Sequence, residues 1–329
     1  MVLNAPAPAD SHPLKISEIV TPTPAPGEVR VRLTHCGVCH TDLHIVEGDL
    51  KLPRLPIVPG HQIVGFVDAV GSGVTQLREG DRVGIPWLHS TDGTCQYCRA
   101  GNENLCDNAQ FTGFNVNGGY ADYTLVEESF ACALPKSFTD LQAAPLLCAG
   151  IVGYRSFKLS GARKGDRLGL YGFGASAHIV LQVARHIGCE VYVFTRSPIH
   201  KEVAARLGAT WTGDAKDTPP SPLDSAIIFA PSGALVPEAL RVTGKGGTVA
   251  LAGITMSPIP RMDYDLLYHE RILRSVANAT RQDAREFLEI AAEIPVQTQV
   301  DLFDLAQANE ALIAVKHSRV GAAAVLKIS

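Results

Sequence analysis

The sequence contains no long hydrophobic run and no recognisable targeting segment. None of its apolar stretches approaches the ~18 to 20 residues that a membrane-spanning helix requires. Its opening, MVLNAPAPADSHP, lacks the charged and then apolar regions of a secretion signal. These two absences predict a cytoplasmic protein with no membrane partner.

An excess of positive charge is also absent, because 29 Lys and Arg residues stand against 33 Asp and Glu residues and the formal net charge is −4. No sequence-wide positive field can therefore recruit nucleic acid or anionic lipid, and we expect neither as a partner. The 329 residues leave room for two domains, and 46% hydrophobic with 19% charged residues is typical of a globular protein.

Two sequence patterns divide the chain. From residue 26 to about residue 90, short alternating apolar segments such as 29–33 and 63–67 are punctuated by Gly and Pro, which predicts a β-rich domain. From Asp166 to about Val276, apolar strands alternate with Ala-rich helical stretches. That alternation is typical of a parallel sheet wrapped by helices, so we expect an α/β fold with a second, β-rich domain.

A Gly-rich turn with the pattern GxGxxA joins an expected strand, 168–171, to a helical run, 178–186. Gly172 allows a tight turn, Gly174 lets the backbone approach a pyrophosphate, and Ala177 permits close helix-strand packing. The alternative is an ordinary Gly-containing turn of an α/β protein. The coenzyme-binding residues expected here are Gly172, Gly174, Ala175, Ser176 and Ala177.

The next expected strand ends without a carboxylate, although an NAD site usually has one there to bind the ribose 2′-hydroxyl. The chain has Thr195, Arg196 and Ser197 instead, whose guanidinium and hydroxyl groups suit a 2′-phosphate. We therefore expect NADP(H) to be preferred over NAD(H). The alternative is that Arg196 simply ends a strand in solvent.

Most of the eight Cys residues are clustered, and in a chain without a secretion signal such clusters more often bind metal or catalyse a reaction. One candidate group contains Cys36, Cys39, His61 and Cys148. Two thiolates and an imidazole suit a catalytic zinc whose fourth position stays open. Spacing alone does not decide which Cys is a ligand, because Cys36 and Cys39 could also form half of a zinc ribbon or be buried apolar residues.

A second group contains Asp92, Cys95, Cys98 and Cys106 on a Gly- and Asn-rich loop that has few large apolar residues. Four potential ligands on such a loop predict a closed, structural zinc site, which would make two zinc ions per chain. The alternative is a surface loop that carries three incidental Cys residues.

These motifs, in this order, resemble the zinc-containing alcohol dehydrogenases of the medium-chain dehydrogenase/reductase superfamily. The resemblance runs from about Leu14 to Leu326 and rests on GVCHTD, PGHQIVG, CQYCRAGNENLC, the GxGxxA turn and VTGKGGTVALAG. It implies a discontinuous GroES-like catalytic domain, residues 1–151 and 285–329, and a Rossmann domain of residues 152–284 between its parts.

The resemblance also assigns residue roles. It implies that Cys39, His61 and Cys148 bind the catalytic zinc and that Cys36 only packs. It further implies that Thr41 places a hydroxyl beside the substrate oxygen, that His44 relays a proton toward solvent, and that Asp42 supports His61. Zinc would act as a Lewis acid for hydride transfer between an alcohol or aldehyde and the coenzyme.

The chain departs from this family at several positions. Gln62 stands where Glu is usual after the ligand His, and a neutral amide cannot replace a carboxylate near the metal. Asp92 aligns with the usual first Cys of the structural site; a carboxylate can bind zinc, and His89 is the nearby alternative. The residues 321–322, Gly-Ala, stand where many relatives carry an Arg for the coenzyme phosphates.

Two residues, Leu50 and Trp87, are expected to line the substrate pocket. Leu50 stands where yeast-type ethanol enzymes have a Trp, which leaves more apolar volume. Trp87 aligns with an aromatic pocket wall, although it could instead be a core Trp of the β-rich domain.

We expect an NADP-preferring, zinc-dependent alcohol dehydrogenase or aldehyde reductase. Two alternatives remain: a metal-free quinone or enone reductase of the same superfamily, which would lack Cys39, His61 and Cys148, and a non-enzymatic sensor or nucleic-acid binder with only structural zinc. We also expect a homo-oligomer, dimer or tetramer, which requires an exposed edge strand in the Rossmann sheet.

Overall fold

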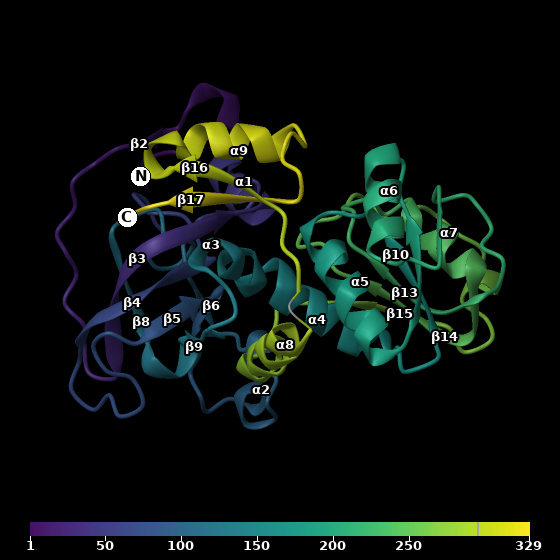
Figure 1. Cartoon of the computed structure of the whole chain (residues 1–329), viewed down its shortest axis with the longest axis horizontal. Helices are drawn as coiled ribbons and strands as arrows, with labels where there is room; N and C mark the ends of the chain where they lie inside the picture. The colour runs from purple at the N-terminus through teal and green to yellow at the C-terminus, as the bar shows by residue number, and fades with distance from the viewer. Residues whose placement is uncertain (295) are drawn as a thin grey trace. The chain divides into compact units, whose positions relative to one another are not determined.

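Two units make up the computed structural model, which describes residues 1–294 and 296–329 (Figure 1). Unit 1 comprises Met1–Cys148 and Thr280–Ser329, and unit 2 comprises Ala149–Ala279. The domain limits expected from the sequence, after residue 151 and before residue 285, lie a few residues downstream of these boundaries. Within the described residues, no helix combines the length and apolar character needed to cross a membrane.

Unit 1 is built on a seven-stranded sheet in the order β16-β17-β3-β4-β5-β9, with β8 also paired to β3. The alternating residues Val29, Val31 and Leu33 of β3 are fully buried in the core of this unit, as their period of two predicts. The strands of this sheet are β3 Glu28–Val38, β4 Ile63–Val70, β5 Arg82–Ile85, β8 Tyr123–Glu127, β9 Cys132–Ala133, β16 Val300–Asp304 and β17 Ala323–Lys327.

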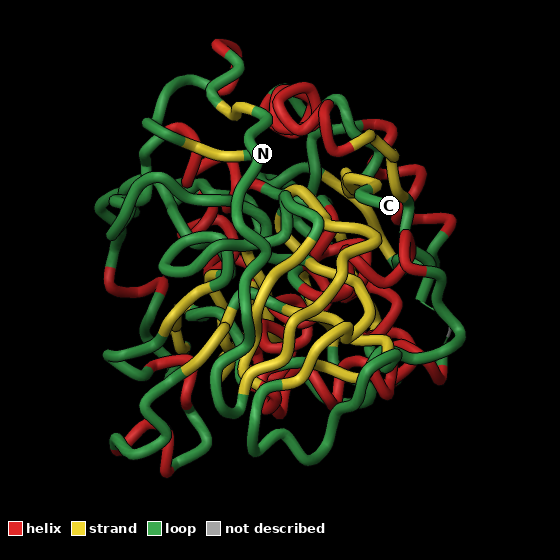
Figure 2. The backbone as a smooth tube through the Cα atoms, turned by 90° about the vertical axis from the view of Figure 1, so that its left-hand side faces the viewer, coloured by secondary structure: helices red, strands yellow, loops and turns green. Residues whose placement is uncertain are grey.

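The C-terminal strand β17 pairs antiparallel with β3, so both ends of the chain contribute to unit 1. Figure 2, in which this unit faces the viewer, shows its strands lying side by side. Two small hairpin-like pairs join β1 to β2 and β6 to β7. Their bounds and those of the helices of unit 1 are β1 Val2–Leu3, β2 Leu14–Lys15, β6 Leu88–Ser90, β7 Gln110–Phe111, α1 His40–Glu47, α2 Gln96–Arg99, α3 Asp140–Ala143, α8 Arg281–Glu293 and α9 Ala308–Lys316.

Unit 2 contains six parallel strands in the order β12-β11-β10-β13-β14-β15. Counted along the chain this order is 3-2-1-4-5-6, the Rossmann order, in which a ligand binds at the carboxyl ends of the strands where the order reverses. The elements are β10 Arg167–Tyr171, β11 Glu190–Phe194, β12 Trp211–Gly213, β13 Leu223–Ile228, β14 Thr243–Leu251, β15 Ile272–Ser275, α4 Ala149–Ser160, α5 Ala175–Ile187, α6 Pro198–Arg206 and α7 Leu235–Val242.

Two apolar clusters cover the two faces of this parallel sheet. Leu168 and Leu170 of β10 pack in one cluster with residues of α4 and α5, whereas Tyr171 packs in the other with residues of α7. Because β10 is buried on both faces, it reads as a continuous apolar run rather than an alternating one. The expected α/β fold with a GroES-like domain and a Rossmann domain is confirmed.

Candidate active site

Three segments of unit 1 bring Cys39, His61 and Cys148 together. Cys39 precedes α1, His61 lies just before β4, and Cys148 ends the short 3₁₀ segment Ala144–Leu147. Their ligand atoms all lie within 4.8 Å of one another, and Cys39 Sγ is 3.4 Å from His61 Nε2. Two such ligands on a tetrahedral zinc would be about 3.5 Å apart, so the donor set fits this metal.

The His61 ring is oriented by Asp42. Nδ1 of His61 lies 3.0 Å from Asp42 Oδ1, while Asp42 Oδ2 accepts the Cys39 backbone N–H at 2.9 Å. Both side chains are buried, and Asp42 is also part of the capping box that begins α1. One carboxylate therefore directs Nε2 of His61 toward the cysteines and holds the residue that carries one of the sulfurs.

The local electrostatics favour protons on this group when no cation is bound. Burial lowers the pKa of His61, but Asp42 and Cys39 more than offset this effect and raise it to about 10. Contact with Cys148, together with burial, raises the pKa of the Cys39 thiol well above its usual range. A cation that binds here must displace these protons, as metal ions do in thiolate and imidazole sites.

Cys36 lies outside this group. Its side chain is fully buried in the core of unit 1, and its Sγ would lie 3.0 Å from a Cβ added to Gly60. Among the described residues, the convergent ligand atoms are those of Cys39, His61 and Cys148 and not that of Cys36. The structure therefore places Cys39, and not Cys36, with His61 and Cys148.

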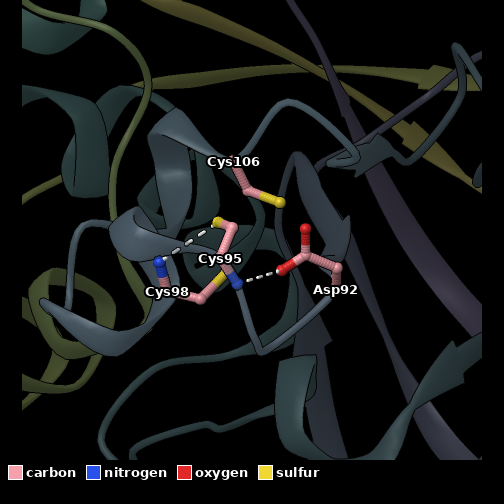
Figure 3. Close-up of side chains that lie close together, drawn as sticks. All are labelled: Asp92, Cys95, Cys98 and Cys106. Atoms are coloured by element: carbon pink, nitrogen blue, oxygen red, sulfur yellow. Dashed lines mark hydrogen bonds between the residues drawn. The ribbon is translucent and has the colours of Figure 1, made fainter.

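The second group, which we call the Cys-rich lobe (residues 92–106), also converges. Figure 3 shows Asp92, Cys95, Cys98 and Cys106 turned toward one another, and their ligand atoms all lie within 4.8 Å of one another. Asp92 accepts hydrogen bonds from the backbone N–H groups of Thr94 and Cys95, both at 2.9 Å. The Cys95 N–H, with Asn108 and Thr94, holds the pKa of the Asp92 carboxyl well below its usual range, so this oxygen donor is anionic.

His89, the alternative ligand, lies elsewhere. Its side chain is 6% exposed and lines a separate cavity with Glu28, Tyr123 and Leu125. Asp92, and not His89, lies beside the three cysteines. The potential donors of the Cys-rich lobe are therefore three sulfurs and one carboxylate, a set that zinc can bind.

The Gly-rich turn of unit 2 has the shape of a phosphate cradle. Gly172 has φ +86°, and a Cβ there would meet Ala230 at 3.0 Å, so glycine is required at this position. Nothing lies within 4 Å of the Cβ position of Gly174, which begins α5 without a side-chain cap. The first amides of α5, from Ala175, Ser176 and Ala177, therefore remain available to an anion.

The residues after β11 differ in exposure. Thr195 is buried, Ser197 caps α6 by accepting the His200 N–H, and Arg196 is exposed. No residue described by the structure pairs with the Arg196 guanidinium.

Comparisons with known proteins agree with this geometry. Residues 25–136 match the family described as Alcohol dehydrogenase GroES-like domain, and residues 177–293 match Zinc-binding dehydrogenase. The chain is 47% identical to a probable alcohol dehydrogenase AdhA of Mycobacterium tuberculosis over 98% of this chain and 95% of that one. It is 36% identical to an alcohol dehydrogenase of Geobacillus stearothermophilus over 96% of each. Its fold is similar to a cinnamyl alcohol dehydrogenase of Sorghum bicolor, with TM-score 0.90, 26% identity and coverage of 99% and 97%.

The chain belongs to the zinc-containing alcohol dehydrogenase family. It is therefore an oxidoreductase of the medium-chain dehydrogenase/reductase superfamily.

Within this alcohol dehydrogenase, Gln62 occupies a confined position. Its side chain is 3% exposed, and Oε1 lies 2.6 Å from where a Cβ on Gly37 would be. Nε2 has no hydrogen-bond partner among the described residues. The neutral amide is thus held next to His61 by packing over a glycine of β3 rather than by a polar contact.

Thr41 and His44 lie three residues apart on α1 and so share one face of the helix. The Thr41 backbone N–H donates to Cys39 Sγ at 3.3 Å, which keeps Thr41 beside the Cys39, His61 and Cys148 group. Nδ1 of His44 lies 2.8 Å from Asp49 Oδ2, and the His44 side chain is 20% exposed. His44 therefore reaches both solvent and a carboxylate.

The ring of Trp87 contacts His61, one of the three residues that converge with Cys39 and Cys148. Its ring stands edge-on to the His61 ring, with centroids 4.8 Å apart, and stacks on Phe111 at 5.2 Å. Both Trp87 and Leu50 are half-buried against the core of unit 1. Trp87 is thus a core contact and a neighbour of His61 at once.

The sequence motifs do not predict the contact between Glu103 and Arg281. Glu103 is 4% exposed and accepts the Arg281 backbone N–H at 2.9 Å and its guanidinium Nε at 3.2 Å. The Arg281 guanidinium also lies over the ring of Phe130 at 4.6 Å. The Cys-rich lobe is therefore anchored to the first residue of α8, and the only sequence signal for Glu103 is a charged residue inside the Cys cluster.

Proposed function

We propose that the protein is a zinc-dependent alcohol dehydrogenase or aldehyde reductase that moves a hydride reversibly between a primary or secondary alcohol and a nicotinamide coenzyme, with NADP(H) preferred over NAD(H). The observation that carries this proposal is the convergence of Cys39, His61 and Cys148 with a buried Asp42 behind the imidazole. Three ligands of this kind are typical of a catalytic zinc that keeps one position open.

When bound, zinc supplies a Lewis acid and the nicotinamide supplies a hydride donor or acceptor. In this proposal Asp42 holds the His61 tautomer that presents Nε2 to the metal. Thr41 places its hydroxyl beside the reacting oxygen. His44, which contacts Asp49 and solvent, moves the released proton outward.

We propose a second zinc in the Cys-rich lobe, bound by Asp92, Cys95, Cys98 and Cys106. All four positions are filled by protein atoms, so this ion would contribute to stability rather than to chemistry. Support comes from the convergence of the four side chains and from the low pKa of Asp92.

The coenzyme preference rests on Arg196. An exposed guanidinium that has no partner among the described residues, next to the Ser197 and Thr195 hydroxyls, suits a 2′-phosphate better than a 2′-hydroxyl. No Asp or Glu occupies residues 195–197 to favour NAD(H).

We also propose a homo-oligomer. Strand β15 is an edge of the Rossmann sheet, and three of its four residues are exposed. Ile272, Tyr264 and Tyr268 are 51%, 72% and 54% exposed, so a large apolar surface accompanies this edge. A second copy of the chain would cover both the unpaired strand and the apolar side chains.

One experiment separates the alternatives: zinc content measured together with turnover of a panel of alcohols and aldehydes, each assayed with NADPH or NADP⁺ and with NADH or NAD⁺. We expect zinc-dependent turnover of simple alcohols and aldehydes that is faster with the phosphorylated coenzyme. Turnover of quinones or enones that survives zinc removal would favour the metal-free reductase. Coenzyme binding without any turnover would favour the sensor.

A further inference from the structure

A second side chain, besides Arg196, is placed to distinguish the two coenzymes. His200 lies in the first turn of α6, and its backbone N–H donates to Ser197 Oγ at 3.3 Å. The Ser197 hydroxyl thus ties the start of α6 to the segment that follows β11. His200 follows Arg196 by four residues along the chain.

The His200 ring also reaches the Gly-rich turn. Its centroid lies 6.2 Å from that of Phe173, at an interplanar angle of 63°. Phe173 stands between Gly172 and Gly174 and is 5% exposed, so its ring provides a fixed wall. The imidazole therefore lies between the turn that would hold the coenzyme diphosphate and the segment that would meet the ribose 2′ position.

We propose that His200 is a second cationic contact for the 2′-phosphate of NADP(H) and that it makes the coenzyme preference depend on pH. The inference rests on the proposed NADP(H) preference. It adds a second residue that contacts the phosphate and a protonation step coupled to binding.

The surroundings of His200 support this role. Burial lowers the pKa of its imidazole, and no charged neighbour contributes to the shift, so the ring is neutral near pH 7 in the free protein. Lys201, the next residue, pairs with Asp214 at 2.8 Å. The other titratable or charged groups on the surrounding elements are Arg196 before α6, Glu202 and Arg206 on α6, and His178, Arg185 and His186 on α5.

A phosphate dianion near this ring would favour the imidazolium form and raise its pKa. Between the lower pKa of the free protein and the higher pKa of the complex, binding then takes up a proton. The contribution of His200 to NADP(H) affinity is therefore complete below the lower pKa and is lost as pH rises through the higher one. NADH and NAD⁺, which lack the phosphate, would not share this dependence.

The test is calorimetric titration of the zinc-loaded protein with NADP⁺ and with NAD⁺, from pH 6 to 8, in two buffers of different ionisation heat. The wild type is compared with His200→Gln and with His186→Gln, a control at the opposite, exposed end of α5. Protons exchanged by the nucleotide itself are common to all three proteins. We expect NADP⁺ to bind with more proton uptake in the wild type and control than in His200→Gln, by up to about half a proton on average over this pH range.

The dissociation constant for NADP⁺ should correspondingly rise by up to about tenfold more between pH 6 and pH 8 in the wild type than in His200→Gln. Equal proton uptake by wild type and His200→Gln, with NADP⁺ still preferred, would overturn the role of His200 alone. If wild type binds NADP⁺ no better than NAD⁺ at any pH, the proposed coenzyme preference fails as well.

Discussion

The Asp42 carboxylate lies 3.0 Å from Nδ1 of His61, and neither side chain is more than 1% exposed. A buried carboxylate in this position fixes the imidazole tautomer and strengthens Nε2 as a ligand. The contact therefore links the start of α1 to the loop before β4.

Replacing Asp42 by Asn should weaken zinc binding at the Cys39 group by roughly 10- to 100-fold, because the amide cannot provide the same negative charge to His61. Chelator competition measures this affinity without relying on turnover. Zinc at the Cys-rich lobe serves as the internal reference, since Asp42 does not contact that site. An unchanged affinity at the Cys39 group would show that the contact does not support the metal.

Replacing Cys39 by Ser should remove one zinc per chain and reduce turnover to background, because a three-ligand site loses a thiolate. Cys36→Ala is the matched control: Cys36 is buried beside the site but outside the convergent group, so we expect lower stability with zinc and turnover retained. Elemental analysis of both variants decides the assignment. Loss of zinc in Cys36→Ala with retention in Cys39→Ser would reverse it.

The Cys-rich lobe can be tested by two substitutions at Asp92. Asp92→Asn keeps an oxygen for the Thr94 and Cys95 N–H groups but removes the charge, whereas Asp92→Ala removes both. If the carboxylate is a ligand, both variants should lose zinc from the lobe and melt at lower temperature, by about 2 to 4 °C for each kcal/mol lost. Full zinc content in Asp92→Asn would mean that Asp92 only orders the loop.

Short sequence patterns predicted the features of this fold that depend on neighbouring residues. They did not predict contacts between residues that are far apart in the sequence. The Gly172 turn and α5 are read from neighbouring residues, since a glycine with positive φ and a helical apolar period are properties of a short segment. Strand β16 was missed because its residues are mostly exposed and do not alternate. The Glu103–Arg281 contact joins residues 178 positions apart, each an ordinary charged residue in its own segment.

The choice among the cysteines shows the same limit. Spacing left Cys36 and Cys39 equivalent, and only the resemblance to a known family favoured Cys39. The structure distinguishes them because Cys36 lies on β3 with its side chain in the core, whereas Cys39 caps the start of α1 beside His61 and Cys148. The direction in which each Cys side chain points depends on how its segment packs in the folded protein. A short sequence pattern does not contain this information.

Arg196→Ala should narrow the preference for NADPH over NADH, mainly by raising the KM for NADPH. A hydrogen-bonded contact between a guanidinium and a phosphate contributes about 1.5 to 3 kcal/mol, or roughly ten- to a hundredfold in affinity. Steady-state kinetics with both coenzymes measure the change, and the KM for NADH should remain near its wild-type value. Equal or better use of NADH by the wild type would refute the assignment.

Substrate size provides the last prediction. Leu50 and Trp87 are half-buried against the same core, and Trp87 lies against the ring of His61, so a substrate near the metal group would meet this aromatic surface. With Leu50 in place of a larger aromatic residue, each additional methylene of a substrate buried there should contribute up to ~0.8 kcal/mol until the space is filled. We therefore expect higher kcat/KM for medium-chain and benzylic alcohols, or their aldehydes, than for ethanol.

Leu50→Trp should reverse that order while leaving the zinc content unchanged, because the substitution fills volume and removes no ligand. A wild type that already prefers ethanol, or a chain-length profile that does not change in Leu50→Trp, would show that Leu50 does not line the substrate pocket.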